Sequence, residues 1–298
     1  MAFTAKDVKD LREKTGCGMM DCKKALTESN GDVEKAIEFL REKGLATAAK
    51  KSGRIAAEGL VDAYVGENGI GALIEVNSET DFVAKNADFK AFVATLVKMV
   101  ADENPADVDA LKALKYTDSE LTVEEMLREK ILTIGENLSI RRFARFCCGA
   151  VSYIHGEGRI GVLVKVEGDL ANADVQEAAK DAAMQIAAIN PLYLSKETVP
   201  AEDVEKEKAV IVAQIKEDPK NANKPDNIIE KMVGGKINKF YEQNCLLQQE
   251  FVKNGDFTVE AYLASKGVKL VDYIRFEKGE GLEKREDNFA DEVASMIK

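Results

Sequence analysis

The sequence predicts an α+β protein in which helical segments flank two related units, each built on a small antiparallel sheet. Three observations support this prediction. A hairpin-like segment occurs twice at a constant spacing of 90 residues, the first 54 residues form a series of short capped helices, and the second half contains two helical stretches joined by a proline-flanked turn. The length of 298 residues fits about two domains, with further small modules attached.

The N-terminal segment, residues 1–54, is expected to hold three helices, because each helical pattern begins at a capping residue or ends at a breaker. The expected helices cover residues 5–15 after Thr4, residues 20–29 before Asn30 and Gly31, and residues 33–43 between Asp32 and Gly44. Residues 46–51 then suggest a tether. Met19 and Met20 stand at the turn before the second helix, where they either fill the small core or form an adaptable contact surface.

An internal repeat organises the middle of the chain. Three pairs of segments match at an offset of 90: residues 59–61 with 149–151, 66–67 with 156–157, and 70–76 with 160–166. Each copy consists of two β-rich runs joined by a glycine-rich turn, which predicts a β-hairpin. A helix follows in both copies, with apolar residues at helical spacing.

The two helices match at an offset of 86, so the first copy carries four extra residues between its strand and its helix. They fall in the stretch VNSETDFVAKN, residues 76–86, which places Asp81 beside Phe82. An insertion at such a junction is a typical place for function on a rigid scaffold. The alternative is that Phe82 packs into its own subdomain while Asp81 caps the next turn. The repeat argues against this, because the second copy closes its core without such a residue.

The remaining elements follow in order. Thr122 and Glu125 form a capping box that opens a helix, and residues 140–146 predict an extra strand whose arginines 141, 142 and 145 are expected on an exposed face. Residues 200–217 and a helix through Ile229 and Phe240 predict an antiparallel hairpin. A late strand at 268–276 is expected to complete the second sheet. Phe289, Val293 and Ile297 predict a C-terminal amphipathic helix.

Composition limits the possible functions. A net charge of −11 argues against a nucleic-acid backbone as the main partner, because phosphate contacts need a basic face. No apolar run reaches membrane-spanning length, and the N-terminus shows no targeting pattern. Five cysteines in a long chain favour a reduced, cytoplasmic setting over a disulfide framework. The chain has one histidine, and no two of its cysteines have the two-residue spacing of a zinc site, so a metal site is not predicted.

Two glycine motifs resemble nucleotide-binding sequences without their context. Residues 156–161 fit G-x-G-x-x-G, but a strand follows where a helix is required, so we expect a hairpin turn. Gly234, Gly235 and Lys236 lack the earlier glycine of a phosphate-binding loop. No nucleophile–base arrangement or carboxylate pair stands out, so we expect no catalytic residue and no cofactor.

Several longer segments carry a resemblance to a known family. They are LREKTG at 11–16, GMMDCKKAL at 18–26, TDFVAK at 80–85, HG at 155–156 with RIGVLV at 159–164, and IRFE at 274–277 with GEG at 279–281. Together they resemble bacterial elongation factor Ts, in the right order over nearly the whole chain.

The resemblance implies a guanine nucleotide exchange factor that binds the GDP form of elongation factor Tu and promotes GDP release so that GTP can enter. It implies that Thr80, Asp81, Phe82 and Val83 dislodge Mg²⁺ from that GTPase, and that Arg12, Met19, Met20 and His155 contact it. On this basis, we hypothesise that Phe82 wedges between helices of the GTPase while Asp81 perturbs groups near the metal. From the residues alone, His155 is more often a structural histidine than a contact.

The resemblance also implies a modular architecture. The expected modules are a ubiquitin-associated-like bundle at 1–54, a first core subdomain with its connecting helix at 55–148, a second at 149–198 and 242–281, a helical hairpin at 199–241 that offers a homodimer contact, and a C-terminal module at 282–298. Two other functions stay open. The bundle could recruit ubiquitin-like or nascent-chain partners, or a small-molecule enzyme site could lie between the repeats, which requires a convergent polar cluster that the sequence does not display.

Overall fold

The N-terminal segment is a bundle of three helices joined to the rest of the molecule by continuous helix. The structure, a computed structural model, describes residues 3–218, 221 and 224–283. The three helices are α1 (Ala5–Thr15), α2 (Met19–Glu28) and α3 (Val33–Lys51). Thr4 and Asp7 form a capping box at the start of α1, and Asp32 caps α3.

Two expectations for this segment are wrong. α3 does not stop at Gly44 but continues to Lys51, so residues 46–51 are helical and do not form a tether. Gly44 is buried where α3 crosses α7 (Val123–Ile134), and a Cβ there would lie 3.7 Å from the Arg128 carbonyl oxygen. A glycine inside a helix therefore marks a close packing contact rather than an end. Met19 and Met20 are the first residues of α2, not part of the turn before it.

The first sheet is antiparallel with the strand order β1-β2-β3. Its strands are β1 (Glu58–Val65), β2 (Gly71–Ser78) and β3 (Leu138–Phe146). The helices that follow β2 are α4 (Asp81–Lys85), α5 (Ala87–Glu103), α6 (Val108–Ala113) and α7. Side chains from α5 and α7 pack with one face of this sheet in a single apolar core. The capping box of Thr122 and Glu125 opens α7 as expected.

The second sheet has the same form with the order β4-β5-β6. Its strands are β4 (Ala150–His155), β5 (Ile160–Glu167) and β6 (Lys269–Glu277). Its helices are α8 (Ala173–Ile189) and α11 (Val259–Ser265), with 3₁₀ turns η1 (Lys196–Thr198) and η3 (Leu246–Gln248). The late strand therefore completes the second sheet. The glycine motif at 156–161 lies in a hairpin, as expected, with residues 156–159 connecting β4 to β5.

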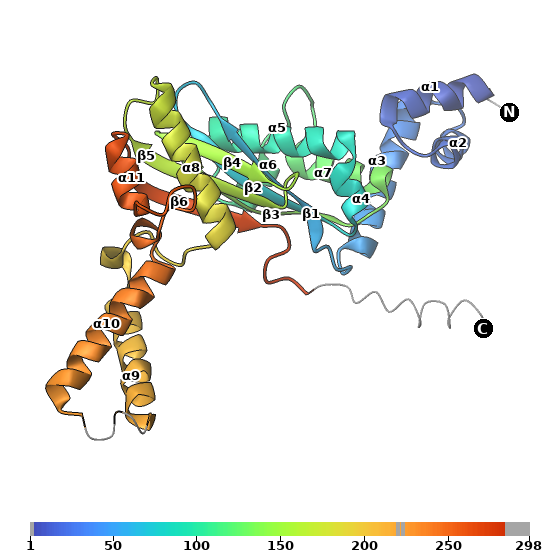
Figure 1. Cartoon of the computed structure of the whole chain (residues 1–298). Coiled ribbons are helices and arrows are strands. Elements are labelled where there is room, and N and C mark those ends of the chain that lie inside the picture. The colour runs from blue at the N-terminus through green and yellow to red at the C-terminus, as the bar shows by residue number, and fades with distance from the viewer. Residues whose placement is uncertain (1–2, 219–220, 222–223, 284–298) are drawn as a thin grey trace.

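The two sheets pack against each other through their inner faces. Val61 and Leu73 of the first sheet meet Leu163 and Phe276 of the second in one apolar cluster. The outer faces are covered by helices, with α5 on the first sheet and α8 on the second (Figure 1). Every residue of β2 is buried because β2 is a central strand covered on both faces.

The structure confirms the internal repeat in detail. The central strand of each sheet has a register shift against the third strand at matching positions, Glu75/Val76 in the β2–β3 pair and Lys165/Val166 in the β5–β6 pair. The helix after each hairpin is capped by an asparagine side chain, Asn86 for α5 and Asn172 for α8. Each of these helices also ends on a left-handed asparagine. The offset is thus 90 in the strands and 86 in the helices.

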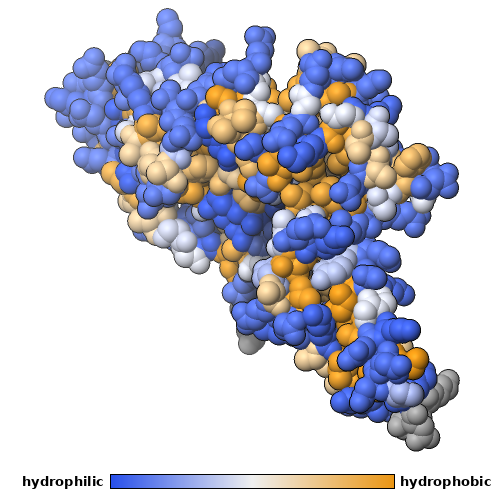
Figure 2. Space-filling view, turned by 90° about the vertical axis from the view of Figure 1, so that its left-hand side faces the viewer, coloured by the Kyte–Doolittle hydropathy of each residue, from blue (hydrophilic) through white to orange (hydrophobic). Residues whose placement is uncertain are grey.

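The helical hairpin projects away from the sheets, at the opposite end of the molecule from the N-terminal bundle (Figure 1). It consists of α9 (Ala201–Glu217) and α10 (Asp226–Asn244), which pack through a small core that contains Ile211, Ile215 and Ile237. Figure 2 views the end of the molecule that carries the hairpin and shows apolar side chains reaching the surface along it. The helix expected at Phe289, Val293 and Ile297 lies outside the described residues. Within the described residues, no helix is long and apolar enough to span a membrane.

Candidate functional site

The junction that carries the four extra residues of the first copy contains the five-residue helix α4, which points an aromatic ring into solvent. Phe82 is 79% exposed, more than any other large apolar side chain among the described residues. Its neighbours Val83 and Ala84 are buried, and Val83 belongs to the core of the first sheet. The alternative that Phe82 packs into its own subdomain is therefore wrong, because Val83 supplies that contact instead.

The residues before α4 are tied to the start of β3. Thr80 donates two hydrogen bonds to the Glu136 carboxylate, from its amide at 2.9 Å and from its hydroxyl at 2.6 Å. Glu79 accepts a hydrogen bond of 2.6 Å from the Asn137 amide. Thr80 occupies the N-cap position of α4 but makes no side-chain cap bond, because its hydroxyl is engaged by Glu136. The exposed ring therefore stands on a fixed base, which limits the entropy lost when a partner covers it.

The two charged side chains of α4 pair with each other beside the ring. Lys85 donates a hydrogen bond of 2.7 Å to Asp81, and its ammonium lies 5.9 Å from the centroid of the Phe82 ring. This hydrogen bond lowers the pKa of Asp81 and raises the pKa of Lys85, so both are charged at neutral pH. Asp81 therefore does not cap the next turn. Its carboxylate lies next to the apolar ring and is held by a bond on an exposed surface that a partner can replace.

The N-terminal bundle approaches α4 on the same face of the molecule. Gly16, at the end of α1, and Phe82 line one shallow depression, together with residues of α7 such as Lys130 and Thr133. Met19 and Met20 follow Gly16 closely in the chain and are 52% and 73% exposed. The structure thus favours the contact-surface interpretation of the two methionines, since Cys17, Cys22 and Leu26 fill the bundle core instead. Arg12 is also exposed, in the last turn of α1.

His155 ends β4 and is exposed, so it is not a buried structural histidine. Its Nδ1 lies 3.0 Å from the hydroxyl of Tyr153. The turn that follows reaches the first sheet, where the Gly158 carbonyl accepts a hydrogen bond of 2.7 Å from the Val61 amide. After Asp81, the carboxylate of Glu157 in this turn also helps to raise the pKa of Lys85. The β4–β5 turn therefore lies close to α4, although the two are more than 70 residues apart in the chain.

A buried ion network beneath this region was missed by the sequence analysis. Glu75 on β2 has no exposed surface, yet its carboxylate accepts hydrogen bonds from Arg141 at 2.9 Å, Arg142 at 2.6 Å and the Gly279 amide at 2.8 Å. The expectation that these arginines only solvate an exposed face is wrong: Arg141 and Arg142 are half-buried partners of Glu75. An acid inside the apolar run at 71–76, beside a strand rich in arginine, was the available signal.

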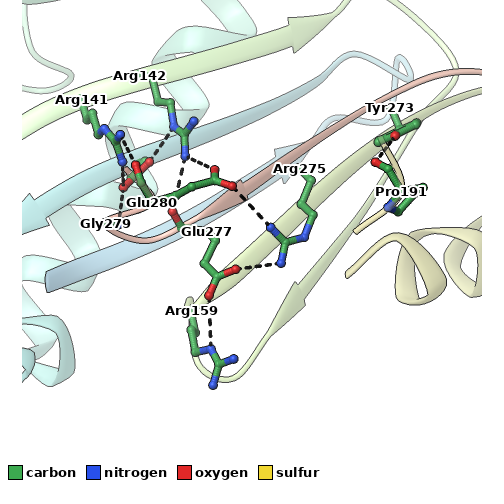
Figure 3. A network of polar contacts seen from close by, with 10 residues as sticks. Arg141, Arg142, Arg159, Pro191, Tyr273, Arg275, Glu277, Gly279 and Glu280 are labelled. Carbon is green, nitrogen blue, oxygen red and sulfur yellow. Dashed lines mark hydrogen bonds and ion pairs between the residues drawn. The ribbon is translucent and has the colours of Figure 1, made fainter. Parts of the chain in front are cut away.

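The network fixes the turn after β6 against the first sheet. Arg142 also binds Glu280, and Arg275 binds Glu277 (Figure 3). Gly279 fits closely against the residue before β1, because a Cβ there would lie 2.1 Å from the Ala57 carbonyl oxygen. Lys278 pairs with Glu58, and its charge helps to lower the pKa of Asp81 after Lys85. The last described residues of the chain therefore leave the sheets beside α4.

Hydrogen bonding keeps Glu75 ionised in spite of its burial. Desolvation alone would raise its pKa, but the bonds from Gly279, Arg141, Arg142 and Asn77 together lower the pKa below its usual value. Removing the acceptor would leave two guanidinium groups without their shared anion. The network is consequently a strong candidate for what holds the two sheets and the turn in register.

No group of three or more histidine, cysteine or acidic side chains in the described part of the chain is arranged to hold a metal ion. The polar residues around α4 are paired with one another or engaged by backbone, and they do not form a nucleophile–base arrangement. The features that remain are a rigid exposed ring, a charged pair next to it, and two neighbouring surfaces with exposed methionines and a histidine. Such a surface suits binding to another protein.

Comparison with known proteins agrees with this interpretation. Residues 79–280 match the family model described as Elongation factor TS. The chain is 52% identical over 305 residues to Elongation factor Ts of Clostridium botulinum (strain Eklund 17B / Type B), with 99% of both chains covered. The chain belongs to the elongation factor Ts family. The proteins of the same name from Clostridium kluyveri (strain ATCC 8527) and Clostridium perfringens (strain SM101) are 52% and 51% identical, again with 99% of each chain covered.

Membership in the elongation factor Ts family places the chain among the elongation factors of protein biosynthesis, and exchange-factor function follows from the family. The matched region begins at Glu79 and ends at Glu280. It therefore spans α4, β3, the second sheet and the turn after β6, and it leaves the N-terminal bundle, β1 and β2 outside.

Proposed function

We propose that the chain binds the GDP form of elongation factor Tu and accelerates GDP release by disturbing the Mg²⁺ and phosphate site of that GTPase, after which GTP can enter. In this proposal Thr80, Asp81, Phe82 and Val83 form the segment that dislodges the metal. The observation that carries the proposal is Phe82, a large apolar side chain 79% exposed on a helix whose base is hydrogen-bonded to Glu136, just before β3.

The four residues have different roles, which follow from where their side chains lie. Val83 anchors α4 in the core, and Thr80 ties the start of α4 to Glu136. Phe82 is then free to enter a pocket between helices of the partner, while Asp81 exchanges its bond with Lys85 for groups near the partner's metal. Mg²⁺ demands a nearly ideal octahedral set of ligands, so a small displacement of those ligands weakens its binding. The segment moves the metal's ligands and does not need to chelate the ion.

The free energy of burying Phe82 is comparable with the free energy needed to weaken GDP binding. Burying one phenylalanine side chain contributes roughly 1.5–3 kcal/mol, and each tenfold weakening of GDP binding takes about 1.4 kcal/mol. Phe82 alone thus supplies roughly one to two factors of ten. Coupling between two binding sites is reciprocal, so GDP must weaken binding of the factor as much as the factor weakens binding of GDP. Further acceleration requires more contacts, and Arg12, Met19, Met20 and His155 are the residues we propose for them.

The test is stopped-flow release of a fluorescent GDP from loaded elongation factor Tu. We expect the full chain to accelerate release in a saturable manner at millimolar Mg²⁺. Chelation of Mg²⁺ by EDTA should speed GDP release in the absence of the factor. It should also reduce the ratio of the release rates with and without the factor, because the metal has then already been removed. An unchanged release rate at all concentrations of the chain would contradict the proposal. Acceleration that is the same with and without EDTA would contradict the role of the metal.

We also propose that the hairpin is a contact between two copies of the chain. Val210 on α9 and Ile228 on α10 are 50% and 38% exposed, which provides apolar area outside the hairpin core. Sedimentation velocity tests this proposal: wild type should form dimers that the exposed substitution Val210→Asp dissociates. A wild-type chain that sediments as a monomer at tens of micromolar would contradict it.

A further inference from the structure

Two adjacent thiols occupy the connection between the two sheets. β3 ends at Phe146 and β4 begins at Ala150, so Cys147, Cys148 and Gly149 form the whole crossover. Both cysteines of this pair are exposed, whereas Cys17, Cys22 and Cys245 are buried. The Sγ atoms of Cys147 and Cys148 lie 3.7 Å apart, within hydrogen-bonding distance for sulfur. The pair is therefore an exposed dithiol in a protein whose other thiols are shielded.

This convergence is a property of the bend. In an extended strand, neighbouring side chains point to opposite faces, so two consecutive cysteines would diverge. Here residues 147–149 form a bend, and Gly149 adopts a left-handed φ of 64°. A Cβ at Gly149 would lie 2.3 Å from the Val166 carbonyl oxygen, so glycine is required at this close approach.

The backbone on the β4 side of the pair is held by hydrogen bonds. The Val166 amide donates to the Gly149 carbonyl at 2.8 Å, and the Ala150 amide donates to the Gly69 carbonyl at 3.1 Å. On the other side Phe146 is buried between the sheets. The two thiols are thus presented by a fixed frame, which lowers the entropic cost of a ligand that must bind both.

The two sulfur atoms also influence each other chemically. The Cys147 thiol raises the pKa of Cys148, first through their hydrogen bond and then through its charge. Zinc normally requires four ligands, and no group of three or more metal-binding side chains exists among the described residues. The site offers two soft sulfur atoms and no third metal-binding side chain. It therefore favours a compound whose central atom forms two bonds to sulfur.

We propose that Cys147 and Cys148 form a dithiol site for monosubstituted trivalent arsenic compounds. In the reaction, an arsenic oxide R–As=O and the two thiols give a cyclic R–As(S)₂ adduct. Two S–H bonds and the As=O bond are replaced by two As–S bonds, and one water molecule leaves. No oxidant or reductant is needed. The cyclic adduct consists of the arsenic atom, the two sulfur atoms and the backbone between Cys147 and Cys148.

The site is separate from the surface proposed for the GTPase. In the first sheet, Phe146 pairs with Gly71, whereas Leu138 at the other end of β3 pairs with Ser78, beside α4. Six of the eight registered β2–β3 pairs lie between those two ends. The inference therefore does not depend on the proposed exchange function, and binding at the dithiol should leave the Thr80–Phe82 region free.

The experiment uses phenylarsine oxide with the reduced, full-length chain under native conditions. We expect intact-mass spectrometry to show one arsenical per chain and thiol titration to show the loss of two reactive thiols. A small 1,2-dithiol should remove the arsenical, whereas an equal concentration of a monothiol should not. Either single substitution, Cys147→Ser or Cys148→Ser, should weaken binding roughly 100-fold or more, because the second bond then loses its intramolecular advantage.

Both serine variants change exposed side chains, so the fold should be retained, which circular dichroism can confirm. Cys245→Ser serves as the matched control and should bind like wild type. Failure of the native wild-type chain to bind, or binding that survives both Cys147→Ser and Cys148→Ser, would overturn the proposal. Binding that appears only after denaturation would also overturn it, since the buried cysteines would then be responsible.

Discussion

The two copies of the hairpin-and-helix unit share a backbone plan and differ at the junction between strand and helix. Ten positions separate Val76 from the cap Asn86 in the first copy, and six separate Val166 from the cap Asn172 in the second (86 − 76 and 172 − 166). The extra four positions are used for α4, which turns Val83 inward and Phe82 outward. The comparison shows how a duplicated scaffold can acquire a binding element without changing its core.

A second difference lies in the strands themselves. Glu75 in the first copy corresponds to Lys165 in the second, at the same side of the same register shift. Glu75 is buried and bonded to two arginines, whereas Lys165 is only partly buried. The first copy therefore holds the turn after β6 by a buried charge, and the second copy has no such charge at the corresponding place.

The largest expected effect is on stability at Glu75. We expect Glu75→Ala to lower the free energy of unfolding by about 3–5 kcal/mol, the range for removing one partner of a buried ion pair. Lys165→Ala, the matched change in the second copy, should cost about 0.5 kcal/mol or less. Urea denaturation at neutral pH measures both. Equal losses of unfolding free energy in the two variants would contradict the proposed difference between the two copies.

The pH dependence provides the control for this prediction. The pKa of Glu75 is lowered in the folded chain, so its contribution is fully present above the unfolded value of about 4.5 and is lost as pH falls through the folded value. The difference in unfolding free energy between wild type and Glu75→Ala should therefore shrink as the pH is lowered below 4.5. A difference that stays constant into that range would show that packing, not charge, is responsible.

The next effect separates the two sides of α4. Val83 is 7% exposed, and Val83→Ala should cost about 2 kcal/mol through lost burial and a small cavity. Phe82→Ala removes a larger side chain but should change the unfolding free energy by no more than about 0.5 kcal/mol, because the ring is exposed. Thermal or urea unfolding of the two variants gives the comparison. A Phe82→Ala variant that is less stable than Val83→Ala would mean that the ring packs into its own chain.

A smaller effect is expected at the base of α4. Thr80→Val keeps the size of the side chain but removes the hydroxyl that donates to Glu136, so we expect a loss of about 1 kcal/mol. Hydrogen exchange of residues 80–86 should also increase. Thr27→Val is a suitable control, because the Thr27 hydroxyl donates to the Lys23 carbonyl of its own helix, far from α4 in the chain. If exchange in residues 80–86 is unchanged in Thr80→Val, the hydroxyl does not fix α4.

His155 should show the smallest effect on stability. It corresponds to Val65 in the first copy, and both side chains are exposed at the end of a strand. We expect His155→Ala to slow factor-stimulated GDP release about fivefold, which is about 1 kcal/mol, with the melting temperature unchanged. Val65→Ala should leave GDP release unchanged. Full activity together with a lowered melting temperature would instead make His155 a structural residue.

Local patterns were sufficient for much of this structure. The offset of 90 predicted two hairpins, the offset of 86 located the insertion, and the capping box at Thr122 placed α7. These features depend on residues close in sequence. The length of α3 was misjudged because Gly44 is tolerated inside the helix by its contact with α7, which is distant in the chain.

The site was predictable only in part. Asp81 and Phe82 were identified from the insertion, but the role of Glu75 was not, because its partners at Arg141, Arg142 and Gly279 come from a third strand and from a turn some 200 residues later. A charged residue in an apolar strand signals a buried partner without naming it. The position of His155 near α4 likewise depends on the packing of one sheet on the other, which periodicity does not reveal.

The central claim is that the Phe82 ring acts on the partner's metal site, and stopped-flow GDP release from elongation factor Tu tests it directly. At a saturating concentration of the factor, Phe82→Ala should reduce the accelerated rate by about 10-fold to 100-fold, which corresponds to losing roughly 1.5–3 kcal/mol of burial. Phe257→Ala, which removes another exposed phenylalanine, should behave like wild type. Unchanged acceleration by Phe82→Ala at saturation would contradict the account.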